Sequence, residues 1–139
     1  MLFTVLVMSL ILTIAVGISN TTFKQTILSS LAKDSQAAFY QADSAMECAL
    51  YYDITKGYFP KDVPFDQVPL TLPCGTQTMT FDVANSTPNY LFYTQVVTDP
   101  TKGCYGMLFN KTSALFSAVQ AKGYSVCQDT PRKVERVLE

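Results

Sequence analysis

The sequence predicts an α+β protein with one long N-terminal helix, apolar in its first half and amphipathic in its second, packed by a small antiparallel β-sheet. Three observations predict this fold class. No charged residue occurs before Lys24, and residues 24–53 contain neither Pro nor Gly. The second half of the chain instead holds short runs of β-branched and aromatic residues separated by turn sequences. At 139 residues, the chain has room for one domain and an appended helix.

The first segment, residues 1–25, has the length and composition of a membrane helix, because the run MLFTVLVMSLILTIAVGI can cross most of a hydrocarbon layer. A cleaved secretory signal, an ordinary transmembrane anchor and the core helix of a processed filament subunit all fit this length. A signal opens with basic residues and an anchor is normally flanked by them, whereas the first basic residue here is Lys24. The absence of earlier basic residues is expected if a charged leader has been removed and Met1 is the mature N-terminus.

Small residues recur within the apolar segment. Ser9, Thr13 and Gly17 follow one another at steps of four, a spacing that lets two membrane helices approach closely. Small residues are also common in any membrane helix, so that the spacing has two explanations. Helix propensity falls at Gly17 and in the polar residues 19–22, which predicts local unwinding at that point.

Residues 26–56 are predicted to form the amphipathic half of the helix, inside a globular head. The apolar residues recur at spacings of three and four, which places them on one face that we expect to pack against the sheet. That face comprises Leu28, Leu31, Ala32, Ala38, Phe39, Ala42, Ala45, Met46, Ala49 and Leu50. The polar residues that fall off it are Lys24, Lys33, Asp34, Gln41, Asp43 and Glu47.

The second half of the chain is predicted to be a loop followed by the sheet. Residues 57–76 form a Pro-rich surface loop, because Gly57 ends the helical pattern and four of the seven prolines lie in residues 60–74. Residues 77–139 form an antiparallel sheet of four or five strands, whose last, charge-rich strand lies at an edge. The expected strands are 77–83, 90–98, 104–110, 114–120 and 132–138, with a turn at Lys122 and Gly123. The alternating residues expected to face the helix are Phe81, Leu91, Tyr93, Met107 and Phe109.

Charge and residue usage favour a structural protein over an enzyme. The formal net charge of −1 creates no overall field that would attract nucleic acid or an anionic surface. The chain has no His, which removes the commonest general base and metal ligand. Asp43 and Glu47 stand one helical turn apart, but no nucleophile motif, phosphate-binding loop or metal cluster accompanies them. We therefore expect no enzyme activity, no cofactor and no metal site.

The four cysteines are spread through the chain without a C-x-x-C pair. An even number of cysteines behind a membrane-directing segment favours two disulfides in an oxidising compartment over a zinc site or free buried thiols. Four cysteines allow three connectivities. We expect Cys48 to pair with Cys74, which ties the helix to the following loop, and Cys104 to pair with Cys127, which closes the last part of the sheet.

The order of apolar helix, amphipathic continuation, loop, sheet and cysteines resembles the type IV pilins. The segments SLILTIAVGISNTTFKQ and SQAAFYQADSAMECALYYD, with the ending GYSVCQDTPRKVERVLE, are similar to PilX-like pilins of small-genome candidate-phyla bacteria. The resemblance covers most of the chain and is most specific in the helix. The chain departs from the family at position 5, where most pilins carry Glu and this sequence has Val5.

The resemblance implies a structural subunit of a type IV pilus-like filament, which exposes its head for adhesion, motility or DNA uptake. It further implies cleavage of a short leader, methylation at Met1, residence in the inner membrane before assembly and then a place in an extracellular filament at the cell surface. The implied partners are copies of the chain, the inner-membrane assembly machinery and the membrane, whereas DNA or a host surface has no support in the sequence. The residues expected to build the filament core are Met1, Leu2, Phe3, Val5, Leu6, Ser9, Leu10, Thr13, Ile14 and Gly17.

Two other roles stay open at this stage. Val5 is compatible with a minor or tip subunit, in which the family Glu can be absent. The other role is that of a membrane-anchored binding module that never polymerises and that has an aromatic contact patch at the end of the helix. The same aromatic residues could instead seal the helix against the loop. They are Tyr51, Tyr52, Tyr58 and Phe59.

Overall fold

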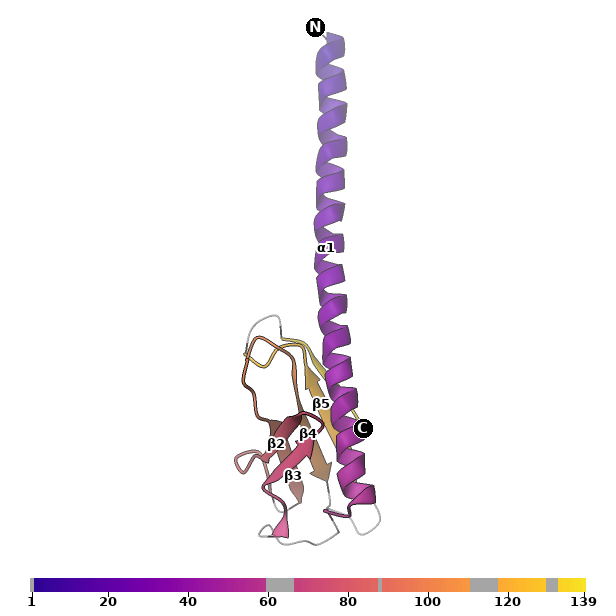
Figure 1. Cartoon of the computed structure of the whole chain (residues 1–139). Coiled ribbons are helices and arrows are strands. Elements are labelled where there is room, and N and C mark those ends of the chain that lie inside the picture. The colour runs from indigo at the N-terminus through magenta and orange to yellow at the C-terminus, as the bar shows by residue number, and fades with distance from the viewer. Residues whose placement is uncertain (1, 60–66, 88, 111–117, 130–132) are drawn as a thin grey trace. The chain divides into compact units, whose positions relative to one another are not determined.

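The computed structural model describes residues 2–59, 67–87, 89–110, 118–129 and 133–139. It contains a long N-terminal helix and a six-stranded antiparallel sheet, so the expected α+β class is confirmed. The chain divides into two compact units, Met1–Lys33 and Asp34–Glu139. Figure 1 shows the helix, labelled α1, and the strands of the sheet.

Helix α1 (Leu2–Leu50) accounts for all described residues of the first unit. It is continuous through residues 17–22, so the predicted unwinding there is wrong. The hydroxyl groups of Thr21 and Thr22 each donate a hydrogen bond to the carbonyl oxygen of Ile18 at 2.9 Å. These hydroxyl groups thus form hydrogen bonds to the preceding turn of the helix, and the helical backbone conformation is kept.

The second unit begins within α1, which is followed by one π-helical turn, η1 (Tyr51–Thr55). Gly57 then adopts a φ of 61°, a left-handed conformation that a side chain disfavours and that ends the helix. This agrees with the helix end expected at Gly57. The strands that follow are β1 (Thr71–Cys74), β2 (Gln77–Phe81), β3 (Tyr90–Gln95), β4 (Cys104–Asn110), β5 (Ala118–Tyr124) and β6 (Glu135–Leu138).

Each strand pairs with the next along the chain, in the order β1-β2-β3-β4-β5-β6. Strand β4 has the bounds expected from the sequence, whereas β2 and β3 are shorter than expected. Strand β6 begins at Glu135, and residue 132 of its expected range lies outside the described residues. Strand β6 lies at an edge of the sheet, as predicted. The expected strand at 114–120 lies partly outside the described residues, and the observed strand β5 extends through the predicted turn at Lys122 and Gly123.

Strand β1 lies inside the segment predicted to be a loop. The strand was not predicted because it contains Pro73, and proline lacks the N–H group that a central strand needs. Strand β1 is at an edge of the sheet and pairs with β2, where Pro73 stands opposite Thr78. Gly75 follows with a φ of 61° in the tight turn that leads into β2. Residues 60–66 of the predicted loop lie outside the described residues.

The core of the second unit lies between α1 and one face of the sheet. Leu91, Tyr93, Met107 and Phe109 are buried in it, and Phe81 packs against it half-buried, as their alternation predicted. The rings of Tyr93 and Phe109 meet edge to face with centroids 6.0 Å apart.

The face of α1 that packs on the sheet is narrower than predicted. Ala38, Ala42, Ala45 and Ala49 are fully buried, and Met46 is half-buried. The other apolar residues expected on this face are exposed, namely Leu28, Leu31, Ala32, Phe39 and Leu50. A helix whose contact surface consists of alanines can approach the sheet backbone closely, which leaves the large side chains on its other faces.

The cysteines form the two bridges expected from the sequence. Cys48 of α1 is bonded to Cys74 at the end of β1, and Cys104 at the start of β4 is bonded to Cys127. The first bridge ties the helix to the first strand, and the second closes the loop after β5 onto the sheet.

Candidate functional site

The apolar half of α1 offers the first candidate surface. Every described residue from 2 to 33 is exposed, and the side chains include Leu2 at 86% and Met8 at 71% of full exposure. Within the described residues, the helical stretch Leu2–Thr55 is long and apolar enough to cross a membrane by its length and composition. An apolar surface of this size is stable only in lipid or against another protein surface.

The predicted assembly residues lie along this surface, apart from Met1, which is outside the described residues. The hydroxyl of Ser9 donates to the carbonyl oxygen of Leu6 at 2.9 Å, and that of Thr13 donates to Leu10 at 2.8 Å. Both hydroxyl groups therefore already donate a hydrogen bond within the helix. A partner helix that packs here contacts small side chains that need no further acceptor. The exposed assembly residues are Leu2, Phe3, Val5, Leu6, Ser9, Leu10, Thr13, Ile14 and Gly17.

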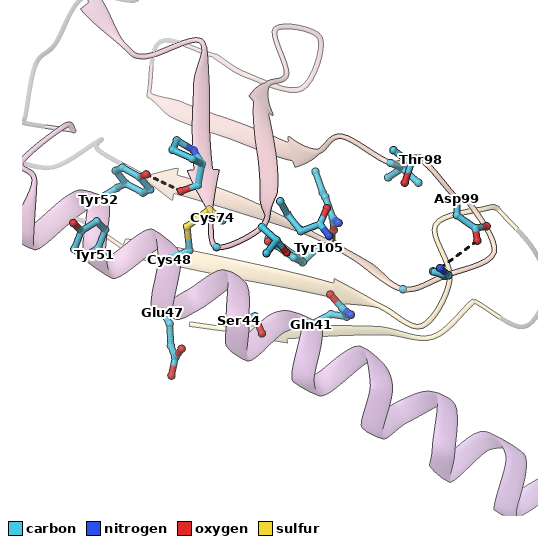
Figure 2. A pocket seen from close by; sticks show the side chains of 18 residues that line it. Gln41, Ser44, Glu47, Cys48, Tyr51, Tyr52, Cys74, Thr98, Asp99 and Tyr105 are labelled. Carbon is cyan, nitrogen blue, oxygen red and sulfur yellow. Dashed lines mark hydrogen bonds and ion pairs between the residues drawn. A yellow bond between two sulfur atoms is a disulfide. The ribbon is translucent and has the colours of Figure 1, made fainter.

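The second candidate is an open groove of about 800 Å³ in the unit Asp34–Glu139. Figure 2 shows it between α1 and the strand ends, with Gln41 and Ser44 on the helix side and Thr98 and Tyr105 on the sheet side. The bridge between Cys48 and Cys74 forms part of its wall. The groove is thus held in shape by a covalent bond between its two sides.

Hydrogen bonds order the side chains at both ends of the groove. The hydroxyl of Tyr52 donates to the carbonyl oxygen of Pro73 at 2.7 Å, which links the end of the helix to strand β1. At the other end, the backbone N–H of Tyr105 donates to the Oε1 atom of Gln95 at 3.2 Å. Burial raises the pKa of Tyr105, so its phenol stays neutral to a higher pH than that of an exposed tyrosine.

Asp99 forms the charged rim of the groove. Its Oδ1 atom accepts hydrogen bonds from the Thr101 hydroxyl at 2.6 Å and from the Thr101 backbone N–H at 3.0 Å. The ammonium group of Lys102 lies 3.7 Å from Oδ2. The two bonds from Thr101 lower the pKa of the Asp99 carboxyl, and the charge of Lys102 adds to this effect.

The groove presents hydroxyl and amide groups that can donate and accept hydrogen bonds, together with tyrosine rings. In the part of the chain that the structure describes, no group of three or more His, Cys, Asp or Glu side chains could hold a metal ion. Sequence reasoning missed this groove, because its walls come from α1, the β1–β2 turn and the segment that joins β3 to β4. No local pattern in the sequence brings these segments together.

The aromatic residues proposed as a contact patch separate into two groups. Tyr52 and Phe59 are buried, and the ring of Phe59 packs against that of Phe109 with centroids 4.1 Å apart. Tyr51 and Tyr58 are exposed at 46% and 44%. Half of the predicted patch therefore seals the helix against the sheet, and only the other half is available to a partner.

Comparison of the chain with protein-family models, with curated proteins and with solved structures gives no match.

Proposed function

We propose that this chain is a structural subunit of a type IV pilus-like surface filament, which polymerises through the apolar half of α1 and exposes its β-rich head. The supporting observation is the uncharged and exposed helix surface of residues 2–23, joined to a head that has its own core and two disulfides. Lipid would cover this surface before assembly, and neighbouring helices would cover it afterwards.

This proposal carries the features that the resemblance to pilins implies. Met1 is methylated after a leader is removed, the chain resides in the inner membrane until the assembly machinery extracts it, and the finished filament lies outside the cell. Without a carboxylate at Val5, the packing of small and apolar side chains determines the register between neighbouring helices. The role of the chain is structural, and the head serves adhesion, motility or DNA uptake.

A membrane-anchored binding module is the second candidate, and the groove between α1 and the sheet is the observation that favours it. Both candidates place residues 2–23 in lipid at first. They differ in whether copies of the chain then assemble into a polymer, so an assembly measurement separates them.

The full chain and a variant that lacks residues 1–25 provide the test. After detergent removal, the full chain should form filaments visible by electron microscopy, and the truncated chain should remain a monomer in analytical ultracentrifugation. The variant Ser9→Leu is a matched probe of close helix packing, since it keeps the segment apolar but adds bulk. It should insert into membranes as the wild type does yet form fewer filaments. Filaments formed by the truncated chain would disprove the assignment of the core.

A further inference from the structure

A second face of α1 in the head leaves large apolar side chains exposed beside acidic ones. Phe39 and Leu50 are exposed at 46% and 41%, and Asp43 and Glu47 lie between them, also exposed. The spacings of four, four and three residues place all four side chains on one side of the helix. We refer to Phe39, Asp43, Glu47 and Leu50 as the acidic face. Figure 2 shows the carboxylate of Glu47 extending from α1 away from the sheet.

The acidic face is distinct from the surface that holds the head together. The sheet packs on the four buried alanines of α1, whereas Phe39 and Leu50 stay exposed and are not among the residues of the core. Phe39 and Leu50 leave apolar area in water, and the two carboxylates between them concentrate negative charge there. The face therefore suits a partner surface that is largely apolar and carries a cation.

The same chain contains such a partner surface. Lys24, Ile27, Leu28 and Leu31 recur at spacings of three and four, and all are exposed. We refer to these four residues as the basic stripe. Both surfaces belong to helix α1, in which Asp43 lies nineteen residues after Lys24, so that a second copy of the chain can present one surface to the other.

We propose that the basic stripe of one copy packs on the acidic face of a second copy, with the ammonium group of Lys24 paired to the carboxylate of Asp43 or Glu47. This interface rests on the filament function proposed above and names the contact that repeats along it. In the proposed filament, each copy turns its basic stripe toward one neighbour and its acidic face toward another, so that the contact is head-to-tail and repeats along an open polymer, whereas reciprocal use of both surfaces by two copies would close a dimer. The apolar neighbours exclude water from the ion pair, which strengthens it relative to a surface pair.

Lys33 provides a matched control for Lys24. It is also exposed on α1 but lies nine residues further along, half a turn out of phase with Lys24. Its neighbours on that side are polar and include Thr26 and Ser29. A change of either lysine to Glu alters the net charge by the same amount, but only Lys24→Glu disturbs the basic stripe.

The experiment uses the full chain, assembled by detergent removal from an equal mixture of unlabelled and ¹⁵N-labelled protein. A carbodiimide then joins amines to carboxylates that are in contact, and mass spectrometry finds the joined peptides. We expect Lys24 joined to Asp43 or Glu47, in pairs that mix the two isotopes. Lys24→Glu should lower the sedimentable fraction about tenfold, and Lys33→Glu should lower it less than twofold. Adding Asp43→Lys and Glu47→Lys to the Lys24→Glu chain should restore assembly.

The outcomes separate this interface from the proposed function. Filaments that form normally with Lys24→Glu, equal losses with Lys33→Glu, or failure of the reversed charges to restore assembly would overturn the interface and leave the filament role intact. Cross-links from Lys24 to acidic residues outside the acidic face would overturn it as well. A wild-type chain that stays monomeric after detergent removal would overturn both proposals.

Discussion

Gly123 of β5 lies directly against the backbone of Ala38 in α1. A Cβ atom placed on Gly123 would overlap the carbonyl oxygen of Ala38 and the backbone nitrogen of Ala42. The helix and the strand therefore touch backbone to backbone, with the fully buried alanines of α1 continuing the contact. Glycine on the strand and alanine on the helix together determine how closely the helix sits on the sheet.

Replacement of Gly123 by Ala should lower the free energy of unfolding of the head by about 3 kcal/mol, because rigid backbone on both sides leaves the methyl group no space. Urea denaturation of the detergent-solubilised full chain, followed by the near-ultraviolet signal of its tyrosines, measures this change. The control is Gly57→Ala, where the added Cβ meets open space and the cost is the strain of a φ of 61°, about 1 kcal/mol. Equal losses in the two variants would contradict the close contact.

Removal of the bridge between helix and sheet should destabilise the head. The variant with Cys48→Ser and Cys74→Ser should lose about 3 kcal/mol of unfolding free energy, since the bridge spans a separation of 26 residues. The bridge from Cys104 to Cys127, across 23 residues, should contribute similarly. Peptide mapping without reduction should recover both pairs, and thermal unfolding with and without reductant gives their effect. Free thiols in the native chain would contradict this prediction.

The head should lose stability at alkaline pH because of buried tyrosines. The Tyr93 hydroxyl donates to the carbonyl oxygen of Pro69 at 2.8 Å, and burial raises the pKa of Tyr93 far above its usual value near 10. The unfolded chain then loses its phenol proton at a lower pH than the folded chain. Unfolding free energy should be unaffected by this residue below pH 10, and should fall above it by about 1.4 kcal/mol per pH unit.

Burial also raises the pKa of Tyr105 and Tyr124, which adds to the same decline. Denaturation midpoints measured between pH 8 and 12 give the slope, and the absorbance of tyrosinate reports ionisation. The variant Tyr93→Phe should reduce the slope, although it also loses the hydrogen bond to Pro69. A stability that stayed constant up to pH 12 would contradict the burial of these phenols.

The rim of the groove provides a local test of hydrogen bonding. Asp99 should titrate below the ordinary range of an aspartate, because the Thr101 hydroxyl and backbone N–H both donate to its carboxylate. In Thr101→Val, the pKa of Asp99 should rise toward its ordinary value, whereas Thr101→Ser should leave it low. A pH titration of the side-chain carboxyl signals by NMR measures all three. If Thr101→Val titrated as the wild type does, the loop geometry would be incorrect.

Several features followed from local sequence. The uncharged run before Lys24 predicted an exposed apolar helix, and Gly57 marked its end. The alternation within residues 104–110 located strand β4, and the even number of cysteines behind an apolar helix predicted two bridges, of which the expected pairs are observed. For the helix and the strand, the signal resides in near neighbours along the chain, through backbone propensity or the period of the element.

Tertiary structure alone decided which face of α1 the sheet would cover. The helix has a face of alanines and a face with Phe39 and Leu50. Both faces are apolar in the helical pattern of the sequence, so the pattern does not show which one is buried. The position of strand β5 was predicted incorrectly for the same reason. A glycine is typical of a turn in the sequence, but Gly123 is a strand residue that lies against Ala38. The groove likewise combines segments that only the fold brings together. The sequence by itself determined which elements form, and close packing between distant residues decided how they fit, because steric exclusion acts between surfaces that meet only after folding.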